Sequence, residues 1–254
     1  MSEPALIDAR GIHTYYGVSH ILHGVDFVVR RGETVGLMGR NGMGKTTLAS
    51  LLSGDLASTS GRIYLDGKDI AGLSADRISQ RGVGRSYQKT NIFLPFTAFE
   101  NCRLAAQSRL KSSMRFTRPA LRYHDVSQQA LRALVEVGLE HRAEVPAATL
   151  SHGEQRQLEI AMTLATRPRI LLLDEPLAGM GSEESARMVE LLQKLKQAHA
   201  MLLVEHDMDA VFALADRLTV MVNGSVLESG PPEQIRASAA VQEAYLGTEE
   251  AHHV

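Results

Sequence analysis

The feature that most constrains this sequence is the glycine-rich stretch at residues 39–46, Gly-Arg-Asn-Gly-Met-Gly-Lys-Thr, which fits the phosphate-binding pattern G-x-x-x-x-G-K-[ST] throughout. An apolar run at 34–38 predicts a strand before it, and leucines at helical spacing within 48–52 predict a helix after it. In that order, backbone N–H groups and the positive end of a helix converge on one point. We therefore expect a phosphate site in which Lys45 reaches the β- and γ-phosphates of a nucleotide and the Thr46 hydroxyl holds Mg²⁺.

A second element carries paired acids. Residues 170–173, Ile-Leu-Leu-Leu, form a continuous apolar run that predicts a strand covered on both faces of a parallel sheet. Asp174 and Glu175 follow at its carboxyl end, where open α/β sheets bind ligands. One carboxylate there can hold Mg²⁺, and the adjacent one can orient or deprotonate a water molecule. Such a run is common by itself and becomes specific in combination with the glycine loop.

Three further positions have both a functional and an ordinary explanation. Gln88 ends the strand predicted at 83–87 and could touch Mg²⁺ or an attacking water, or be a plain loop residue. His206 follows the apolar strand at 201–204 and could hydrogen-bond a γ-phosphate, or be a satisfied histidine at a strand end. A tyrosine of the pair at 15–16 could stack on an adenine base, or pack on the core.

The stretch 150–155, Leu-Ser-His-Gly-Glu-Gln, predicts the start of a helix. Ser151 with Glu154 three residues later forms a capping box, and apolar residues follow at helical spacing. A serine and a glycine, here Gly153, at a helix N-terminus also make an anion site. The two interpretations are compatible, because the cap shapes the site.

The remaining elements follow from periodicity and turn signals. Residues 5–30 predict β structure, and Asp-Gly at 66–67 and Asn-Gly at 223–224 predict hairpin turns. Ser74 and Ser182 are the predicted N-caps of two helices. Three apolar or boundary patterns complete the set: a helical stripe of Leu131, Leu134, Val135 and Leu139, a buried helix face of Met188, Leu191, Leu192 and Leu195, and a C-terminal helix that begins at Pro231-Pro232-Glu233.

A basic insert extends from Ser108 to Tyr123. It holds several cations and no acid: Arg109, Lys111, Arg115, Arg118 and Arg122. A solvated face or a mobile insert explains such a run. The alternative is a surface that lies near anionic lipid headgroups or a membrane partner.

The composition narrows the class of protein. With 44% hydrophobic and 22% charged residues, a chain of 254 residues can bury a full core in one or two domains. The net charge of −2 gives no general attraction for nucleic acid. Cys102 is the only cysteine, which excludes an internal disulfide framework and fits a reducing compartment. No apolar run approaches the ~20 residues of a membrane span and the N-terminus lacks a secretory pattern, so we expect a cytoplasmic chain.

In this order and spacing, the elements resemble the ATP-binding subunit of ABC transporters over nearly the whole chain. The glycine loop matches the family's first nucleotide motif, and Gln88 lies at the position of the glutamine loop. Residues 150–155 lie at the position of the family signature, Asp174 and Glu175 end the second nucleotide motif, and His206 is the switch histidine. The resemblance implies a complete site. In it, ATP is bound by Tyr16, Gly39, Asn41, Gly42, Gly44, Lys45, Thr46 and Thr47, and across a dimer by Ser151 and Gly153, while Glu175, His206 and Gln88 are catalytic and Thr46, Gln88 and Asp174 hold Mg²⁺.

The resemblance also implies the fold and the domain organisation. It predicts an α/β fold of the P-loop NTPase type, with a single ABC ATPase domain over residues 1–254. Residues 1–95 and 167–254 are expected to form a RecA-like core with a mixed, largely parallel sheet and an antiparallel β region. Residues 96–166 are expected to form a helical subdomain that carries the signature. The implied activity is the hydrolysis of MgATP.

A finer resemblance is to the ATPases of importers for branched-chain amino acids and their amide and urea relatives. It rests on Gly-Arg-Ser-Tyr-Gln at 84–88, a long insert at 106–125, and the stretches 157–161, 204–208 and 244–247. It implies a head-to-tail dimer with a second ATPase subunit, identical or related. It also implies transmembrane permease subunits and, indirectly, a periplasmic or extracellular substrate-binding protein, with no nucleic acid. The chain is then expected to be peripheral on the inner face of the cell membrane.

Other functions stay open at the level of the sequence. An ATPase of a lipid or lipopolysaccharide export system would look similar but lacks the long insert. A soluble ABC protein of DNA repair or translation would need a coiled coil or two ATPase halves, and this sequence has neither. A phosphoryl transferase would share the glycine loop without needing the signature or His206.

Two residues depart from the family pattern. His152 replaces a glycine of the signature, in which Glu154 also stands for a glutamine; we expect His152 near the partner's γ-phosphate, where a cationic imidazole could help to hold it. Gly181 stands where the family usually has the aspartate or asparagine that links the two sites of the dimer. We therefore expect looser coupling between the two sites.

The substitution Gly181→Asp tests this expectation. The added carboxylate should raise the cooperativity of ATP hydrolysis, measured as the Hill coefficient of the rate against ATP concentration. The same cooperativity in the variant and the parent would contradict looser coupling.

Overall fold

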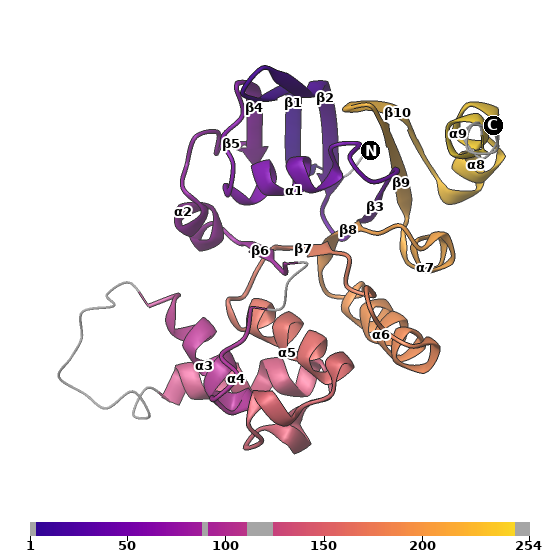
Figure 1. Ribbon diagram of the computed structural model, residues 1–254. Helices are drawn as coiled ribbons and strands as arrows, with labels where there is room; N and C mark the ends of the chain where they lie inside the picture. Colours follow the sequence, from indigo (N-terminus) through magenta and orange to yellow (C-terminus); the bar gives the residue numbers. More distant parts are fainter. Residues whose placement is uncertain (1–3, 88–90, 111–123, 247–254) are drawn as a thin grey trace.

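The structure is a computed structural model that describes residues 4–87, 91–110 and 124–246. Figure 1 shows an antiparallel sheet at the top, a mixed sheet below it and a group of helices at the bottom. Gln88 and residues 111–123 of the basic insert lie outside the described residues, so the predictions made for them stay predictions. Within the described ranges, no helix is both long enough and apolar enough to span a membrane.

The upper sheet is antiparallel, with the strand order β2-β1-β4-β5. In β2, Val25, Phe27 and Val29 are buried and Asp26 is exposed, because successive side chains of a strand point to opposite faces. The predicted turn at 66–67 joins β4 to β5 with positive φ at both residues. The strands are β1 (Ala5–Tyr16), β2 (Ser19–Arg30), β4 (Ser60–Leu65) and β5 (Lys68–Asp69).

The second sheet has the order β10-β9-β3-β8-β7-β6. All neighbours are parallel except β10, which pairs with β9 antiparallel after the predicted Asn-Gly turn at 223–224. The strands are β3 (Thr34–Met38), β6 (Val83–Arg85), β7 (Ile170–Asp174), β8 (Ala200–Val204), β9 (Arg217–Val222) and β10 (Ser225–Gly230). Every residue of β3, β7 and β8 is buried, since other elements cover both faces of these central strands.

The arrangement of β3, β8 and β7 positions the polar motifs. These strands are neighbours in that order and all parallel, so their carboxyl ends meet at one edge of the sheet. The glycine loop follows β3, His206 follows β8, and Asp174 and Glu175 end β7. Residues far apart in the sequence thereby reach one region.

Helices cover both faces of this sheet. α1 (Lys45–Ser53) lies between the two sheets, in one cluster of buried residues that draws on both. α6 (Ser182–Leu195) and α7 (Met208–Leu214) pack against the other face, and the four predicted residues of the buried face of α6 are buried. Three shorter helices lie elsewhere: α2 (Ala75–Gln80), before β6, and α8 (Pro232–Ala237) and α9 (Ala239–Leu246), at the C-terminal end.

The lower group consists of α3 (Ala98–Gln107), α4 (His124–Glu136) and α5 (His152–Ala165), with short 3₁₀ turns at Glu140–Arg142 and Ala147–Thr149. These helices fall within the range 96–166, for which a helical subdomain is predicted; the division into subdomains stays a prediction. Their buried side chains belong to the same continuous cluster as those of α6 and α7, for example Leu134, Leu164 and Leu192.

One predicted helix cap is wrong, and one predicted apolar stripe is only half buried, since Leu134 and Leu139 are buried and its other two members are not. Ser182 does not cap α6: it is the first helical residue, and Gly181 is the N-cap, with no side-chain cap hydrogen bond. On α4, Leu131 and Val135 are 45% and 60% exposed. The buried residues of α4 are instead Val126, Ala130, Ala133 and Leu134. The alanines face inward because α4 packs against both α3 and α5, and small side chains let helices approach closely.

The N-caps of α5, α3 and α2 differ in whether the cap side chain makes a hydrogen bond. The capping box of Ser151 and Glu154 is confirmed at the start of α5. A second capping box, Thr97 with Glu100, begins α3 and was not predicted. Ser74 is the N-cap residue of α2, but its side chain makes no cap hydrogen bond there.

Candidate functional site

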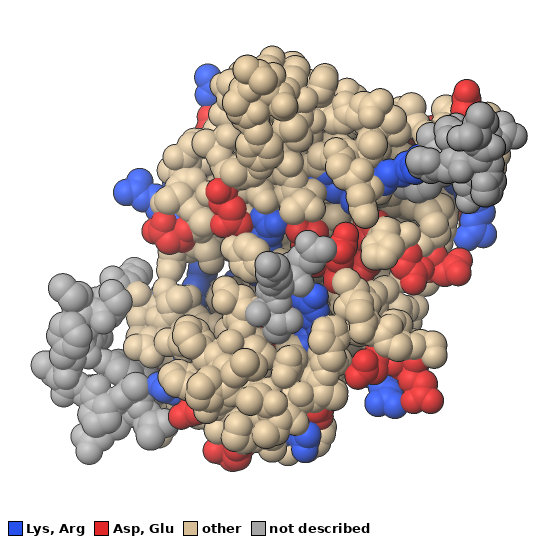
Figure 2. All heavy atoms as spheres, viewed as in Figure 1, with Lys and Arg blue, Asp and Glu red and all other residues tan. Residues whose placement is uncertain are grey.

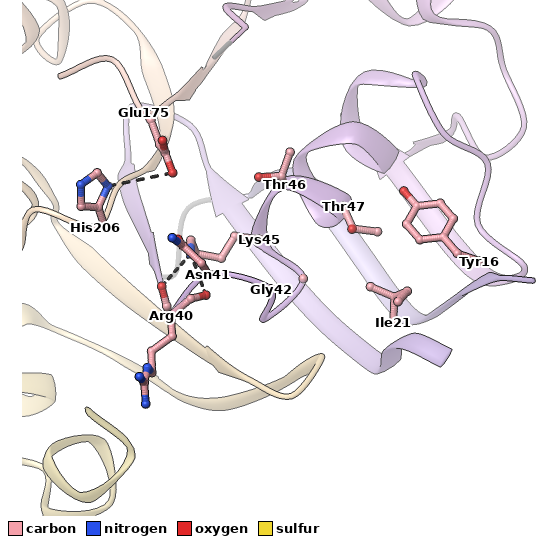
Figure 3. Close-up of a pocket in the computed structure, with 12 residues that line it drawn as sticks. Tyr16, Ile21, Arg40, Asn41, Gly42, Lys45, Thr46, Thr47, Glu175 and His206 are labelled. Carbon is pink, nitrogen blue, oxygen red and sulfur yellow. Dashed lines mark hydrogen bonds and ion pairs between the residues drawn. The ribbon is translucent and has the colours of Figure 1, made fainter. Parts of the chain in front are cut away.

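A cavity of about 710 Å³ lies at the carboxyl edge of the central strands (Figure 3). Figure 3 shows Glu175 and His206 at one end and Tyr16 at the other, with the glycine loop between them. The structure brings together these predicted residues: Tyr16, Gly39, Asn41, Gly42, Gly44, Lys45, Thr46, Thr47, Glu175 and His206. Ile21 and Arg40 also line the cavity; sequence reasoning did not single them out, because nothing local distinguishes them from ordinary strand and loop residues.

Two glycines of the loop are required by close packing as well as by backbone conformation. A Cβ atom on Gly39 would lie 2.5 Å from the carbonyl oxygen of Met221, and one on Gly44 would lie 2.7 Å from Cδ2 of Leu22. Gly44 also has φ of 97°, in the region that L side chains rarely adopt. The loop can therefore hold its backbone close to both the hairpin β9–β10 and strand β2.

Lys45 is buried at the base of the loop, with 5% of its surface exposed. Its Nζ donates to the carbonyl oxygens of Gly39, at 2.6 Å, and of Arg40, at 3.0 Å. Burial lowers the pKa of Lys45, and the nearby charges of Glu175 and Asp174 oppose this. A buried ammonium ion with neutral acceptors gains from an anion in the adjacent cavity, so the residues present fit a phosphate group.

Asp174 lies at the end of β7 and is 3% exposed. Its Oδ2 accepts a hydrogen bond from Nη2 of Arg85, at 3.1 Å. Burial raises the pKa of Asp174, while the guanidinium of Arg85 favours the ionised form. A carboxylate and the Thr46 hydroxyl are the hard oxygen donors that suit Mg²⁺.

The number of protein donors also fits magnesium. In the part of the chain that the structure describes, no group of three or more His, Cys, Asp or Glu residues could hold a metal ion. Mg²⁺ is usually bound by one or two carboxylates together with waters and substrate phosphates, and does not need such a cage. The donors of Asp174 and Thr46 are therefore compatible with it.

Glu175 turns away from the strand into the cavity. Its φ is 49°, in the left-handed region that is uncommon for residues other than glycine. Its N–H donates to the carbonyl oxygen of Val204, at 2.8 Å, which ties the end of β7 to β8. Its Oε1 lies 3.9 Å from Nδ1 of His206, whose side chain is 61% exposed. Backbone strain of this kind collects at functional sites, where the surrounding structure holds it.

Glu205 is a polar residue that sequence reasoning passed over. It is 1% exposed, and its carboxylate accepts N–H groups from Leu177, at 2.9 Å, and His206, at 3.2 Å. The carboxylate therefore joins the turn after Glu175 to the residue that begins the next loop. An acid directly after the apolar run of β8 was the available signal, since a carboxylate at a buried strand end needs N–H donors.

The structure does not bring Ser151 and Gly153 into this cavity. They line a separate cavity of about 50 Å³ with residues of α6. Ser151 Oγ accepts from the N–H of Glu154, at 3.2 Å, as the capping box requires. The ring of His152 lies near Gly179, where an added Cβ would be 3.4 Å from Cε1 of the histidine. In a single chain, these residues and the glycine loop thus form different surfaces.

The burial of Glu205 leads to a pH prediction. Burial raises the pKa of Glu205, although the N–H groups of Leu177 and His206 oppose it. A carboxyl group with a raised pKa in the folded state gives stability that is full below the unfolded value and is lost as the pH rises through the folded value. Glu205→Gln stays neutral, so its melting temperature should fall less than that of the parent as the pH rises from 4.5, the ordinary value of this group, through the raised folded value.

Glu33→Gln is the matched control. Burial raises the pKa of Glu33, but hydrogen bonds from Arg217 and from the N–H of Arg30 outweigh it, so the folded pKa is lowered. That carboxylate gives stability above its unfolded pKa, and its loss should make the variant relatively weaker as the pH rises. For a chain of this size, about 1 kcal/mol corresponds to roughly 2–4 °C. If rising pH changed the melting temperature of both variants in the same direction relative to the parent, the opposite pKa directions of Glu205 and Glu33 would be contradicted.

Comparisons with known proteins agree with this geometry. A family model described as "ABC transporter" matches residues 22–178, and one described as "Branched-chain amino acid ATP-binding cassette transporter" matches residues 225–251. The high-affinity branched-chain amino acid transport ATP-binding protein BraF of Pseudomonas aeruginosa is 39% identical, and the match covers 97% of this chain and 99% of BraF. The corresponding protein LivG of Escherichia coli is 36% identical, with the same coverage.

Solved structures are similar over nearly the whole chain. The ADP conformation of MJ1267, an ATP-binding cassette of an ABC transporter, has a TM-score of 0.86 at 26% identity and covers 96% of this chain and 99% of that one. The dimeric structure of MJ0796, a bacterial ABC transporter cassette, has a TM-score of 0.76 at 25% identity, with 89% of this chain and 98% of that one covered.

Proposed function

This chain belongs to the ATP-binding family of ABC transporters, and we propose that it is the ATP-hydrolysing subunit of an importer for branched-chain or other hydrophobic amino acids or related amides. ATP hydrolysis is the general activity of the family. The proposed substrate class rests on the relatives BraF and LivG, branched-chain amino acid transport proteins that align over nearly their full length, and on the C-terminal match at 225–251. The relatives favour this function over lipid export and over a soluble ABC protein.

One observation supports hydrolysis within this chain's own site: Glu175, His206 and Lys45 line the same cavity. Lys45 and the loop N–H groups would neutralise phosphate charge, and Tyr16 would contact the base at the far end. Thr46 and Asp174 would hold Mg²⁺, which neutralises charge on the phosphates when bound.

Glu175 is the proposed general base. Its carboxylate is 17% exposed and faces the cavity, so it can align a water molecule and accept its proton. The ring of His206, whose Nδ1 lies 3.9 Å from Oε1 of Glu175, would hydrogen-bond the γ-phosphate. It would thereby offset part of the negative charge near Glu175. Gln88 is proposed as the second sensor of the γ-phosphate and Mg²⁺, on the resemblance alone.

The proposed working unit is a head-to-tail dimer. Ser151 and Gly153 lie outside the cavity of their own chain, which supports a role in closing the site of a partner ATPase, identical or related. The similar cassette MJ0796 has a dimeric structure. Transmembrane permease subunits would convert the closing and opening of the dimer into transport, and a substrate-binding protein would deliver the cargo, with the chain held at the inner face of the membrane.

Glu175→Gln tests the catalytic assignment. The variant should bind ATP with parental affinity and accumulate as a dimer, while hydrolysis falls by about 10²–10⁴-fold, because the amide cannot accept the proton of the water. ATP binding is measured by calorimetry and phosphate release by a coupled assay. Glu183→Gln, whose parent side chain is 86% exposed on α6, should keep the parental rate. A parental rate in Glu175→Gln would mean that another group is the base.

Co-purification tests the proposed partners. The tagged chain is expressed at native level, and membranes are solubilised gently before its partners are identified. We expect two multi-spanning permease subunits, a second ATPase and an amino-acid-binding protein, against a control with the same tag on an unrelated cytosolic protein. A lipid-export assembly, or the absence of any membrane partner, would contradict the importer proposal and leave the ATPase assignment untouched.

A further inference from the structure

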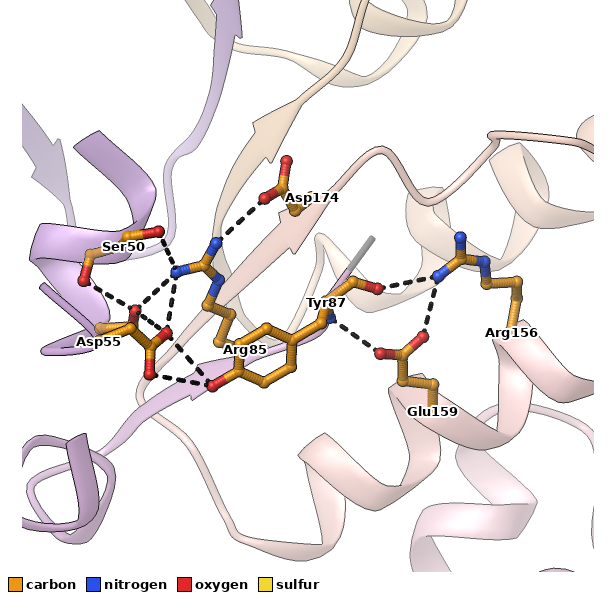
Figure 4. Close-up of polar contacts among 8 residues, drawn as sticks. Ser50, Asp55, Arg85, Tyr87, Arg156, Glu159 and Asp174 are labelled. Atoms are coloured by element: carbon orange, nitrogen blue, oxygen red, sulfur yellow. Dashed lines mark hydrogen bonds and ion pairs between the residues drawn. The ribbon is translucent and has the colours of Figure 1, made fainter. Parts of the chain in front are cut away.

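The backbone of Tyr87 is held from both sides by helix α5 (Figure 4). Its N–H donates to Oε1 of Glu159, at 2.8 Å, and its carbonyl oxygen accepts from Nη1 of Arg156, at 2.9 Å. The same Nη1 donates to Oε2 of Glu159, at 3.1 Å. Two side chains one turn apart on α5 thus fix the residue that directly precedes Gln88.

This contact is costly as a means of stabilising the fold. The side chains of Arg156 and Glu159 are 7% and 6% exposed. Taking an ion pair out of water loses much of what the pair gains, so buried pairs are weak stabilisers compared with apolar packing. Burial raises the pKa of Glu159, and the Tyr87 N–H and Arg156 oppose this shift by binding the ionised form. The more direct consequence of these contacts is that the backbone of Tyr87 is held in one position.

Arg85 joins the same segment to Asp174. Its Nη2 donates to Oδ2 of Asp174, at 3.1 Å, and its Nη1 donates to Oδ2 of Asp55, at 3.0 Å. Nη1 also donates to the hydroxyls of Ser50 and Ser53 on α1, at 3.0 and 2.8 Å. The guanidinium is 7% exposed and approaches two buried elements at once, so it fixes the orientation of the Asp174 carboxylate relative to α1.

The side chain of Tyr87 connects the contacts of α5 with those of Arg85. Its hydroxyl donates to Oδ2 of Asp55, at 3.2 Å, and its ring centroid lies 5.0 Å from Cζ of Arg85. A continuous series of contacts therefore runs from Asp174 through Arg85 and Tyr87 to Glu159 on α5. Figure 2 shows charged side chains of both signs at the junction between the upper part of the molecule and the lower helices.

We propose that Glu159 and Arg85 are positioning residues for the magnesium-dependent binding of ATP. Glu159, with Arg156, holds the backbone of Tyr87, whose ring and hydroxyl contact Arg85 and Asp55. Arg85 in turn holds Asp174 in the orientation that suits Mg²⁺. This proposal rests on the proposed function of the site. Helix α5 begins after Ser151, and Glu159 lies about 12 Å further along it, at 1.5 Å per residue. The contacts of Glu159 therefore link the proposed partner-facing residues Ser151 and Gly153 with Asp174, the proposed magnesium ligand of this chain.

Glu159→Ala tests the proposal in the full-length chain. The probe is a non-hydrolysable ATP analogue, and its affinity is measured by calorimetry with and without Mg²⁺. In the parent, Mg²⁺ should tighten binding; in the variant, this gain should fall at least about fivefold, while the affinity without Mg²⁺ stays within about twofold. Glu159 is not among the residues that line the cavity of the glycine loop and Lys45, where the phosphates would be bound without the metal.

Two variants separate positioning from simple loss of packing. Glu159→Gln keeps an oxygen that can accept the Tyr87 N–H, so it should recover part of the magnesium-dependent gain. Leu164→Ala removes a side chain, 3% exposed, from the same helix and should keep the full gain despite its lower melting temperature. A full gain in Glu159→Ala, or an equal loss in Leu164→Ala, would overturn the proposal.

Arg85→Lys provides a test at the other end of the series, including the case in which Glu159→Ala does not fold. One ammonium group keeps the charge but cannot reach Asp174 and Asp55 with the fork of a guanidinium, so the magnesium-dependent gain should again fall. A parental gain in this variant would contradict the role of Arg85. A parent that binds no analogue would contradict the proposed function itself, whereas a magnesium-dependent parent with unchanged variants would contradict only the positioning roles.

Discussion

The parallel pairing of β3, β8 and β7 is the constraint on which the rest of the site depends. Parallel strands end at the same edge, so one sheet delivers a cationic loop, the carboxylate of Glu175 and a histidine to one cavity, with Asp174 at the end of β7 directly before Glu175. The buried, apolar character of all three strands fixes their register, since a slip of one residue would exchange their two faces. The strand ends then fix where the residues that follow them begin.

The same burial removes several carboxylates from water, and each of them is stabilised by specific hydrogen-bond partners. Asp174, Glu205 and Glu159 are each at most 5% exposed, and burial alone would favour their neutral forms. Asp174 is met by Arg85, and Glu205 by two backbone N–H groups. Each carboxylate also accepts from a residue of another segment, namely Arg85 for Asp174, Leu177 for Glu205 and Tyr87 for Glu159, so stabilising the buried charge also holds neighbouring segments in place.

Local patterns predicted much of this molecule. The glycine loop, the apolar run of β7, the hairpins and the cap of α5 are short-range features. Lys45 and Thr46 could be assigned to a phosphate site because the flanking strand and helix are encoded beside the loop. What escaped prediction depends on partners distant in sequence. Arg85 on β6 contacts Asp174 on β7, a residue far away in the sequence. Leu131 on α4 is exposed because α3 and α5 pack against the face of α4 that carries the alanines. No periodicity within α4 could reveal which face its neighbours select.

The pairing of β6 with β7 also has a consequence for how the chain folds. These neighbouring strands are separated in the sequence by residues 86–169, so all of α3, α4 and α5 lie within one crossover. Closing a long loop costs entropy before the strand contacts repay it, and such non-local pairings slow folding. During synthesis β6 leaves the ribosome well before its partner strand exists. We therefore expect this edge of the sheet to be completed late, with Arg85 exposed to solvent until β7 arrives.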